Sequence, residues 1–111
     1  MAVTLKRIAG PQFLAAAAAD IYTPPASTIY TVLSHLHFAN VTAVSATFTV
    51  YVGATGGSAA GTQLFETYTL GPYGVYDYYC DLRMGSTDFL TGLASAPSTV
   101  TITVEGEQVV V

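Results

Sequence analysis

Hydrophobic and polar residues alternate with a period of two along most of the chain after Asp20. In the segment 44–52 every even position is apolar, and serine, threonine or tyrosine occupies the odd positions. The segment 99–105 repeats the pattern, with Val100, Ile102 and Val104 separated by threonines. Alternation of this kind predicts antiparallel strands that bury one face in a core and leave the other face outside.

The segment 28–40 follows the same rule and contains both histidines of the chain. Between residues 30 and 38 its even positions are apolar except at residue 34, and the apolar members are Tyr30, Val32, Leu36 and Phe38. His35 and His37 occupy odd positions, so we predict that both point away from the core, about 7 Å apart along the strand.

Segments rich in glycine, proline and serine separate these strands and mark the turns. They lie at 23–27, 53–61, 70–74, 84–86 and 95–98. With short strands near 3–8 and 20–23, the chain has about eight strands at regular spacing, which predicts an all-β, antiparallel, jelly-roll-like β-sandwich. Six apolar side chains are expected to be buried together in its core: Phe38, Phe48, Val50, Leu82, Ile102 and Val104.

The first 19 residues lack this alternation and are interpreted as an extended N-terminal arm, with the sandwich domain spanning 20–111. The apolar run of the arm resembles a secretory signal, but Pro11 and Gln12 interrupt it, and it is too short to span a membrane. We expect the arm to dock on a neighbouring chain, and Phe13 and Leu14 are its candidate contact residues.

The composition favours a protein that works by contact with other proteins. Hydrophobic residues make up 51% of the chain and charged residues only 9%, against about 25% charged in a typical domain. A surface with so few charges is better suited to contact with other subunits than to water. The net charge of −4 and the three basic residues, Lys6, Arg7 and Arg83, argue against nucleic acid as a partner.

The residue patterns that usually carry chemistry are missing from the sequence. A zinc site needs a third ligand beside His35 and His37, and a carboxylate from Asp77, Asp81 or Asp88 would reach them only through the fold. The carboxylates of Asp77 and Asp81 share a strand face but lie about 13 Å apart, too far for paired acid catalysis. We therefore expect no enzyme, metal site or cofactor.

The single cysteine, Cys80, excludes an intrachain disulfide and is expected to be a small core residue.

Tyrosines crowd the segment 68–79, at Tyr68, Tyr73, Tyr76, Tyr78 and Tyr79. Exposed tyrosine with few charges nearby is typical of protein interfaces, and a carbohydrate-binding platform is the alternative. The full candidate interface comprises Phe13, Leu14, His35, His37, Tyr73, Tyr76 and Tyr79.

Several motifs resemble those of a family of small structural proteins of tailed bacteriophages. They are "IYTPPA" at 21–26, "LHFAN" at 36–40, "TFTVYVG" at 47–53, "GPYG" at 71–74 and "VTITVEG" at 100–106. The similarity covers roughly residues 8–109. Ser86, Thr87 and Asp88 replace the compact Gly-Asp turn of the family.

The resemblance implies a virion component without catalytic residues, often bound to the outside of the head. The expected function is capsid decoration or a minor capsid role at the virion surface. The expected partners are the major capsid protein or further copies of the chain, as a homo-oligomer, without nucleic acid or membrane. A tail, neck or baseplate component and a glycan-binding module remain the alternatives.

Overall fold

The computed structural model describes residues 2–53 and 62–111, and within these ranges it contains eight strands and no helix. The strands are β1 (Ala2–Phe13), β2 (Ala19–Tyr22), β3 (Thr28–Asn40), β4 (Ala46–Gly53), β5 (Gln63–Leu70), β6 (Val75–Gly85), β7 (Phe89–Ala94) and β8 (Val100–Val110). The loop expected at 53–61 falls almost entirely on residues 54–61, outside the described residues. A search of the described part of the chain for a helix that could cross a membrane finds none.

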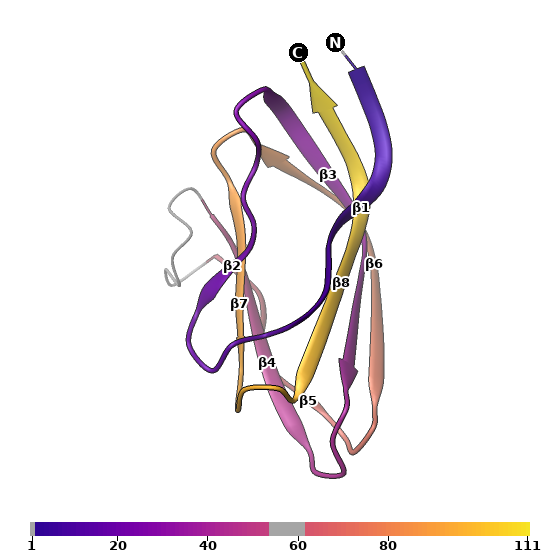
Figure 1. The fold of residues 1–111 in the computed structure, drawn as a ribbon, viewed down its shortest axis with the longest axis vertical. Coiled ribbons are helices and arrows are strands. Elements are labelled where there is room, and N and C mark those ends of the chain that lie inside the picture. The colour runs from indigo at the N-terminus through magenta and orange to yellow at the C-terminus, as the bar shows by residue number, and fades with distance from the viewer. Residues whose placement is uncertain (1, 54–61) are drawn as a thin grey trace.

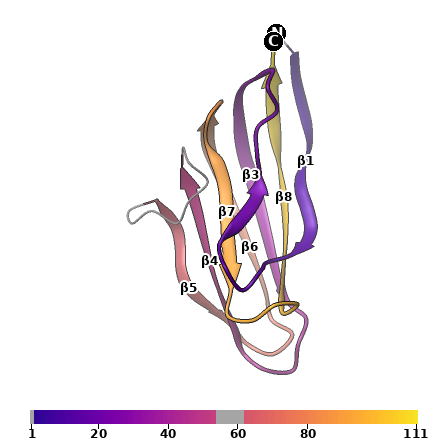
Figure 2. The ribbon, with the colours of Figure 1, turned by 60° about the vertical axis from the view of Figure 1, so that its left-hand side comes forward.

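The strands form two antiparallel four-stranded sheets packed face to face (Figure 1, Figure 2). One sheet has the order β1-β8-β3-β6 and the other the order β2-β7-β4-β5. Every connection except that between β4 and β5 passes from one sheet to the other, which is the double-sheet jelly-roll arrangement. The predicted all-β sandwich is therefore confirmed.

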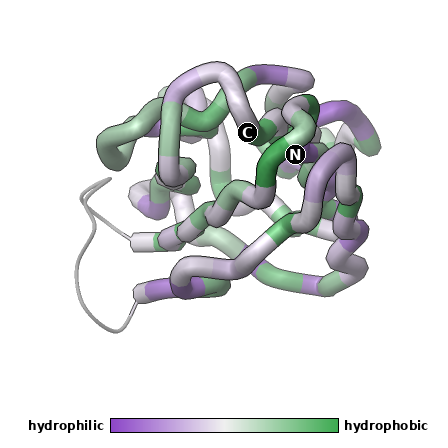
Figure 3. Tube along the Cα trace, turned by 90° about the horizontal axis from the view of Figure 1, so that it is seen from below, coloured by the Kyte–Doolittle hydropathy of each residue, from purple (hydrophilic) through white to green (hydrophobic). Residues whose placement is uncertain are grey.

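The core fills the space between the two sheets. Phe38 of β3 and Phe48 of β4 stack across it with ring centroids 4.0 Å apart. Seen along the long axis, hydrophobic and hydrophilic stretches are interspersed along the strands of both sheets (Figure 3). Five of the six predicted core residues are fully buried, and Leu82 is half-buried and packs against them.

Strand β3 has a β-bulge at Ser34. Its pairing with β8 shifts register between Leu33 and His35, so that Ser34 is an extra residue on β3. The Ser34 hydroxyl donates a 3.1 Å hydrogen bond to the backbone carbonyl of Glu105. An extra residue in a strand reverses which of the following side chains face the core.

The bulge corrects part of the predicted orientation of β3. Before it, Thr31 and Leu33 are fully buried, whereas Tyr30 and Val32, which were expected in the core, point outward and are half-buried. The guanidinium of Arg83, an exposed residue of β6, lies 3.8 Å from the centroid of the Tyr30 ring. Between Tyr30 and Asn40 the even-numbered side chains face inward only after Ser34, which broke the pattern in the sequence.

The sequence had suggested that the N-terminal segment is an arm lying on a neighbouring chain, but the structure shows it as a strand of the sandwich itself. Residues 2–13 form strand β1, which pairs with β8 from Ala2, opposite Val110, onward. Because β1 is an edge strand with a register shift between Ala9 and Gln12, it tolerates Pro11, which has no N–H to donate. The expected boundary at residue 19 therefore separates no domain from the sandwich.

The chain passes from the first sheet to the second directly after β1. The Leu14 N–H donates to the Val100 carbonyl (2.8 Å), and the Ala15 carbonyl accepts from the Ala94 N–H (2.8 Å). The Leu14 side chain is only 2% exposed and belongs to the core cluster. Leu14 was expected at an interface; it instead attaches the end of β1 to the core.

Asn40, the last residue of the "LHFAN" motif, organises the loops at one end of the sandwich. Its side-chain N–H groups donate to the carbonyls of Val44 (2.8 Å), Gly71 (3.0 Å) and Leu70 (3.4 Å). Its amide oxygen accepts from the backbone N–H and the hydroxyl of Thr42 (3.0 and 2.8 Å). The buried asparagine satisfies backbone groups that the loop would otherwise leave unpaired.

Candidate functional site

The two histidines lie on the outer face of the sheet β1-β8-β3-β6, as predicted. The register places His35 opposite Tyr79 of β6 and Glu105 of β8, and His37 opposite Asp77 of β6. Opposite and diagonal residues on one sheet face lie within reach of each other. The pairing of three strands therefore brings these five side chains together.

We call His35, His37, Asp77 and Glu105 the histidine cluster. The Asp77 Oδ1 atom lies 2.8 Å from His35 Nε2 and 2.6 Å from His37 Nδ1. Glu105 Oε1 lies 3.0 Å from the other ring nitrogen of His35, Nδ1. The Tyr79 ring stacks on the His35 ring, with centroids 4.4 Å apart and planes 6° from parallel. His35 is thus hydrogen-bonded at both ring nitrogens, and one face of its ring is covered by Tyr79.

The two carboxylates favour the protonated form of His35. Both of its ring nitrogens face carboxylate oxygens, and both can donate only when the ring is an imidazolium. The hydrogen bond to Glu105, with a further bond and charge from Asp77, raises the pKa of His35 above its ordinary 6.5, although burial opposes the shift. Hydrogen bonds from His37 and then His35 lower the pKa of Asp77 below its ordinary 3.8.

These shifts predict a dependence of stability on pH. His35 has a raised pKa in the folded state, so its stabilisation is complete below about pH 6.5 and is lost as the pH rises through the folded pKa. Asp77 has a lowered pKa, so its contribution is present above about pH 4 and is lost only at stronger acidity. The groups facing His35 are Asp77 of β6, Glu105 of β8 and His37 of its own strand. Arg7 of β1 lies opposite Glu105 in the strand register.

We expect the melting temperature of the parent, measured relative to that of a His35→Gln variant, to decrease as the pH rises from 5.5 to 8.5. The change should be no more than a few degrees (~1–3 °C), because solvent-exposed ion pairs contribute little. Thermal melts of both proteins across this range in a metal-free buffer provide the measurement. Parallel curves for the two proteins would contradict the assignment.

The other predicted interface residues divide into two groups. Tyr73 and Tyr79 are 68% and 73% exposed, and Phe13 is 50% exposed, so all three are accessible. Tyr76 is half-buried and faces the core: it points inward from β6 and stacks on Tyr68 with centroids 4.7 Å apart. Together with the buried Leu14, Tyr76 is removed from the candidate interface.

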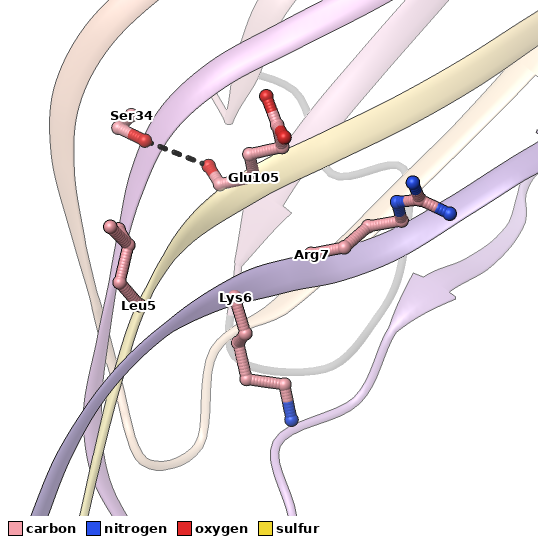
Figure 4. Close-up of a pocket in the computed structure, with 5 residues that line it drawn as sticks. All are labelled: Leu5, Lys6, Arg7, Ser34 and Glu105. Atoms are coloured by element: carbon pink, nitrogen blue, oxygen red, sulfur yellow. Dashed lines mark hydrogen bonds between the residues drawn. The ribbon is translucent and has the colours of Figure 1, made fainter.

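A shallow depression lies on the outer face beside the histidine cluster. Leu5, Lys6, Arg7, Ser34 and Glu105 line it. Figure 4 shows that the Glu105 carboxylate points away from Lys6. Leu5 and Arg7 share the outer face with Glu105, because Arg7 lies opposite Glu105 and side chains two residues apart point the same way. The depression thus extends the cluster toward the apolar edge strand.

Cys80 is half-buried and faces the core, as expected. Its thiol donates a 3.2 Å hydrogen bond to the Leu33 carbonyl, and burial raises its pKa. A raised pKa reduces the thiolate fraction and therefore the reactivity of the thiol.

The sequence did not identify Asp77 and Glu105 as partners of the histidines. The expectation of no metal site rested on the lack of a third ligand beside His35 and His37, and the structure places Asp77 in that position. The signal was the strand "VYDYYCDL", whose outward residues include Asp77, but the sequence alone does not tell which of them pairs with His37.

No protein-family model matches the chain, and no curated protein matches its sequence. Among solved structures, the fold is similar to a chain of Bacillus endospore appendages, which are described as a novel family of disulfide-linked pili. The superposition has a TM-score of 0.57 at 16% identity and covers 98% of this chain and 88% of that chain. At this identity the likeness concerns the fold alone.

Proposed function

We propose that this protein is a non-enzymatic structural subunit that binds into a larger protein assembly through the outer face of the sheet β1-β8-β3-β6. We further propose that the assembly is the head of a tailed bacteriophage, where the chain acts as a decoration or minor capsid protein. The partners are then the major capsid protein and further copies of the chain itself.

The observation that carries the proposal is a set of exposed apolar side chains on this outer face. Leu5 of β1 is 78% exposed, and Val75 and Tyr79 of β6 are 61% and 73% exposed. The neighbouring strands contribute threonines, and charged side chains border the apolar ones. Glu107 of β8 lies opposite Leu5, and Asp77 lies between Val75 and Tyr79 on the same face of β6. Exposed aliphatic and aromatic side chains that are bordered by polar and charged residues are typical of protein-binding sites.

The sequence motifs support a phage head as the assembly. The chain resembles small virion proteins over most of its length, and its compact jelly roll suits a rigid cap on a lattice. A protein that binds the assembled lattice, but not its separated subunits, stabilises the lattice by mass action. No catalytic group is needed for that effect.

A second candidate is a subunit that assembles with itself into a fibre, which the fold likeness to endospore appendages favours. A polymer linked only by disulfides needs at least two cysteines in each subunit, one for each neighbour. The present 111 residues contain one cysteine, and its thiol faces the core. Self-assembly of this chain would therefore depend on non-covalent contacts.

The test is co-sedimentation of the purified chain with phage heads assembled without it. Leu5→Glu should reduce binding by at least about tenfold, since it places a charge in the apolar contact, a change of ~1.4 kcal/mol. Val44→Glu is the matched control, because Val44 is also exposed but lies in the loop at the opposite end of the strands. Both positions are exposed, so both variants should fold.

Several outcomes would count against the proposal. Failure of the parent to sediment with heads would remove the capsid role, and filaments in electron micrographs of the purified chain would favour the self-assembling candidate. Equal losses in the two variants would show that the outer face is not the contact. The copy number in purified virions separates decoration of the whole head from a tail, neck or baseplate position. Binding to a glycan array would favour the carbohydrate alternative.

A further inference from the structure

The histidine cluster has the composition and geometry of a metal site. One ring nitrogen each from His35 and His37 and one carboxylate oxygen of Asp77 all lie within 4.8 Å of one another. The ring nitrogens nearest to Asp77 Oδ1 are Nε2 of His35 and Nδ1 of His37. On a tetrahedral zinc ion with bonds of about 2.0–2.1 Å, ligand atoms lie about 3.3 Å apart. The atoms therefore need small side-chain rotations and no change of the backbone. His37 and Asp77 are free to make them, since their side chains are 36% and 38% exposed.

The environment of His35 matches that of a metal-bound imidazole. Ligating histidines usually donate their second ring N–H to a carboxylate, which fixes the tautomer and the ring orientation. Glu105 Oε1 lies 3.0 Å from His35 Nδ1, on the side of the ring away from Asp77. With Nδ1 protonated toward Glu105, the lone pair of Nε2 points toward Asp77. The Tyr79 ring, stacked on His35, restricts its rotation further.

The backbone sets this arrangement. Two histidines at i and i+2 on one strand face, and an aspartate on the adjacent strand, place three ligand atoms around one point above the sheet. β6 is an edge strand and pairs only with β3 in this sheet. An ion held by His35, His37 and Asp77 would therefore link the edge strand to its neighbour.

We propose that His35, His37 and Asp77 bind a divalent transition-metal ion of the zinc type on the outer face of the sheet β1-β8-β3-β6, with Glu105 orienting His35. Two imidazoles and one carboxylate suit zinc, cobalt, nickel or copper and not the hard ions magnesium or calcium, which prefer oxygen ligands. Three protein ligands leave a further coordination position, and the exposure of the cluster directs it to solvent. Water or a side chain from a partner can occupy that position.

Metal and proton compete for the same nitrogen. Binding requires neutral imidazoles, so the ion displaces the proton that Nε2 of His35 carries in the imidazolium form. The affinity for the ion should fall by at least about tenfold between pH 7.5 and 5.5.

The test is a titration of the tag-free, chelator-treated chain with Zn²⁺ by calorimetry and with Co²⁺ by visible absorption. The tag is omitted because a histidine tag binds these ions itself. We expect one ion per chain, a Co²⁺ spectrum with the intense visible bands of a tetrahedral site, and a rise in the melting temperature with Zn²⁺. His37→Gln and Asp77→Asn should each reduce the affinity at least tenfold. Glu105→Gln should weaken binding less and leave the stoichiometry unchanged.

Asp81→Asn is the matched control, since Asp81 is exposed on the same face of β6 but outside the cluster. Its affinity should equal that of the parent. Thermal melts without metal show whether each variant is folded. A parent that binds no Zn²⁺ at pH 7.5, or that binds it as tightly as folded His37→Gln and Asp77→Asn, would overturn the proposal. These results are independent of whether the chain binds phage heads.

Discussion

Replacing Phe48 by alanine should destabilise the protein by roughly 3–5 kcal/mol, the usual cost of truncating a buried phenylalanine. The Phe48 side chain is 1% exposed, and its ring stacks on Phe38 of the opposite sheet at 4.0 Å. It also contacts Phe65 and Tyr68, with centroids 5.7 and 5.3 Å away. The truncation therefore removes the stacked contact of Phe48 with the opposite sheet and leaves a cavity in the core.

Against a typical stability of about 5–15 kcal/mol, a loss of this size lowers the melting temperature by roughly 10–25 °C. Chemical denaturation of parent and variant measures it. Val44→Ala provides the control, because Val44 is 71% exposed and exposed substitutions usually change stability by less than about 0.5 kcal/mol. A Phe48→Ala loss no larger than that of the control would refute the two-layer packing described above.

Truncating Leu14 to alanine should cost about 2–5 kcal/mol, although it lies in a segment without regular alternation. Leu14 is buried at the crossing between the sheets, and its backbone N–H bonds to Val100 of β8. Loss of its side chain removes the apolar anchor of the C-terminal end of β1. Proteolysis after Lys6 and Arg7 should accelerate, since detached strands are cleaved readily.

Phe13→Ala is the natural comparison for Leu14→Ala. The adjacent side chain is half exposed, so its truncation should cost under about 1 kcal/mol and leave the proteolysis rate nearly unchanged. If both variants were equally stable and equally resistant to trypsin, β1 would not be fixed to the sandwich through Leu14. If instead Phe13→Ala weakened binding to heads without loss of stability, Phe13 would join the contact surface.

The sequence predicted the fold well where strands are regular. The buried apolar side chains keep one parity over residues 46–50 of β4 and 100–104 of β8, so Phe48, Ile102 and Val104 were assigned correctly to the core. In β3 the parity changes at Ser34, and the assignment of Tyr30 and Val32 is wrong for that reason. A bulge depends on the neighbouring strand as well as on the bulged one, which no periodicity of a single segment reveals.

The candidate site was predictable only in part. The outward direction of His35 and His37 follows from the apolar residues that flank them. The proximity of Asp77 follows from the register between β3 and β6, which is set by the whole sheet. Leu14 was missed because the alanines at 15–19 obscure the point where the chain turns into the core.

The strand order β1-β8-β3-β6 has a consequence for biosynthesis. β8 is an interior strand of this sheet and the last of its four strands in chain order, and both β1 and β3 pair with it. Until residues 100–110 emerge, β1 has no strand to pair with in its sheet. Its first paired residue, Ala2, lies opposite Val110, which is 108 positions later in the sequence. Pairing over such a separation is slow, and the waiting strands expose aggregation-prone edges. The nascent chain therefore completes this sheet only after translation of residues 100–110, and its yield in cells should depend on chaperones that cover β1 and β3 until then.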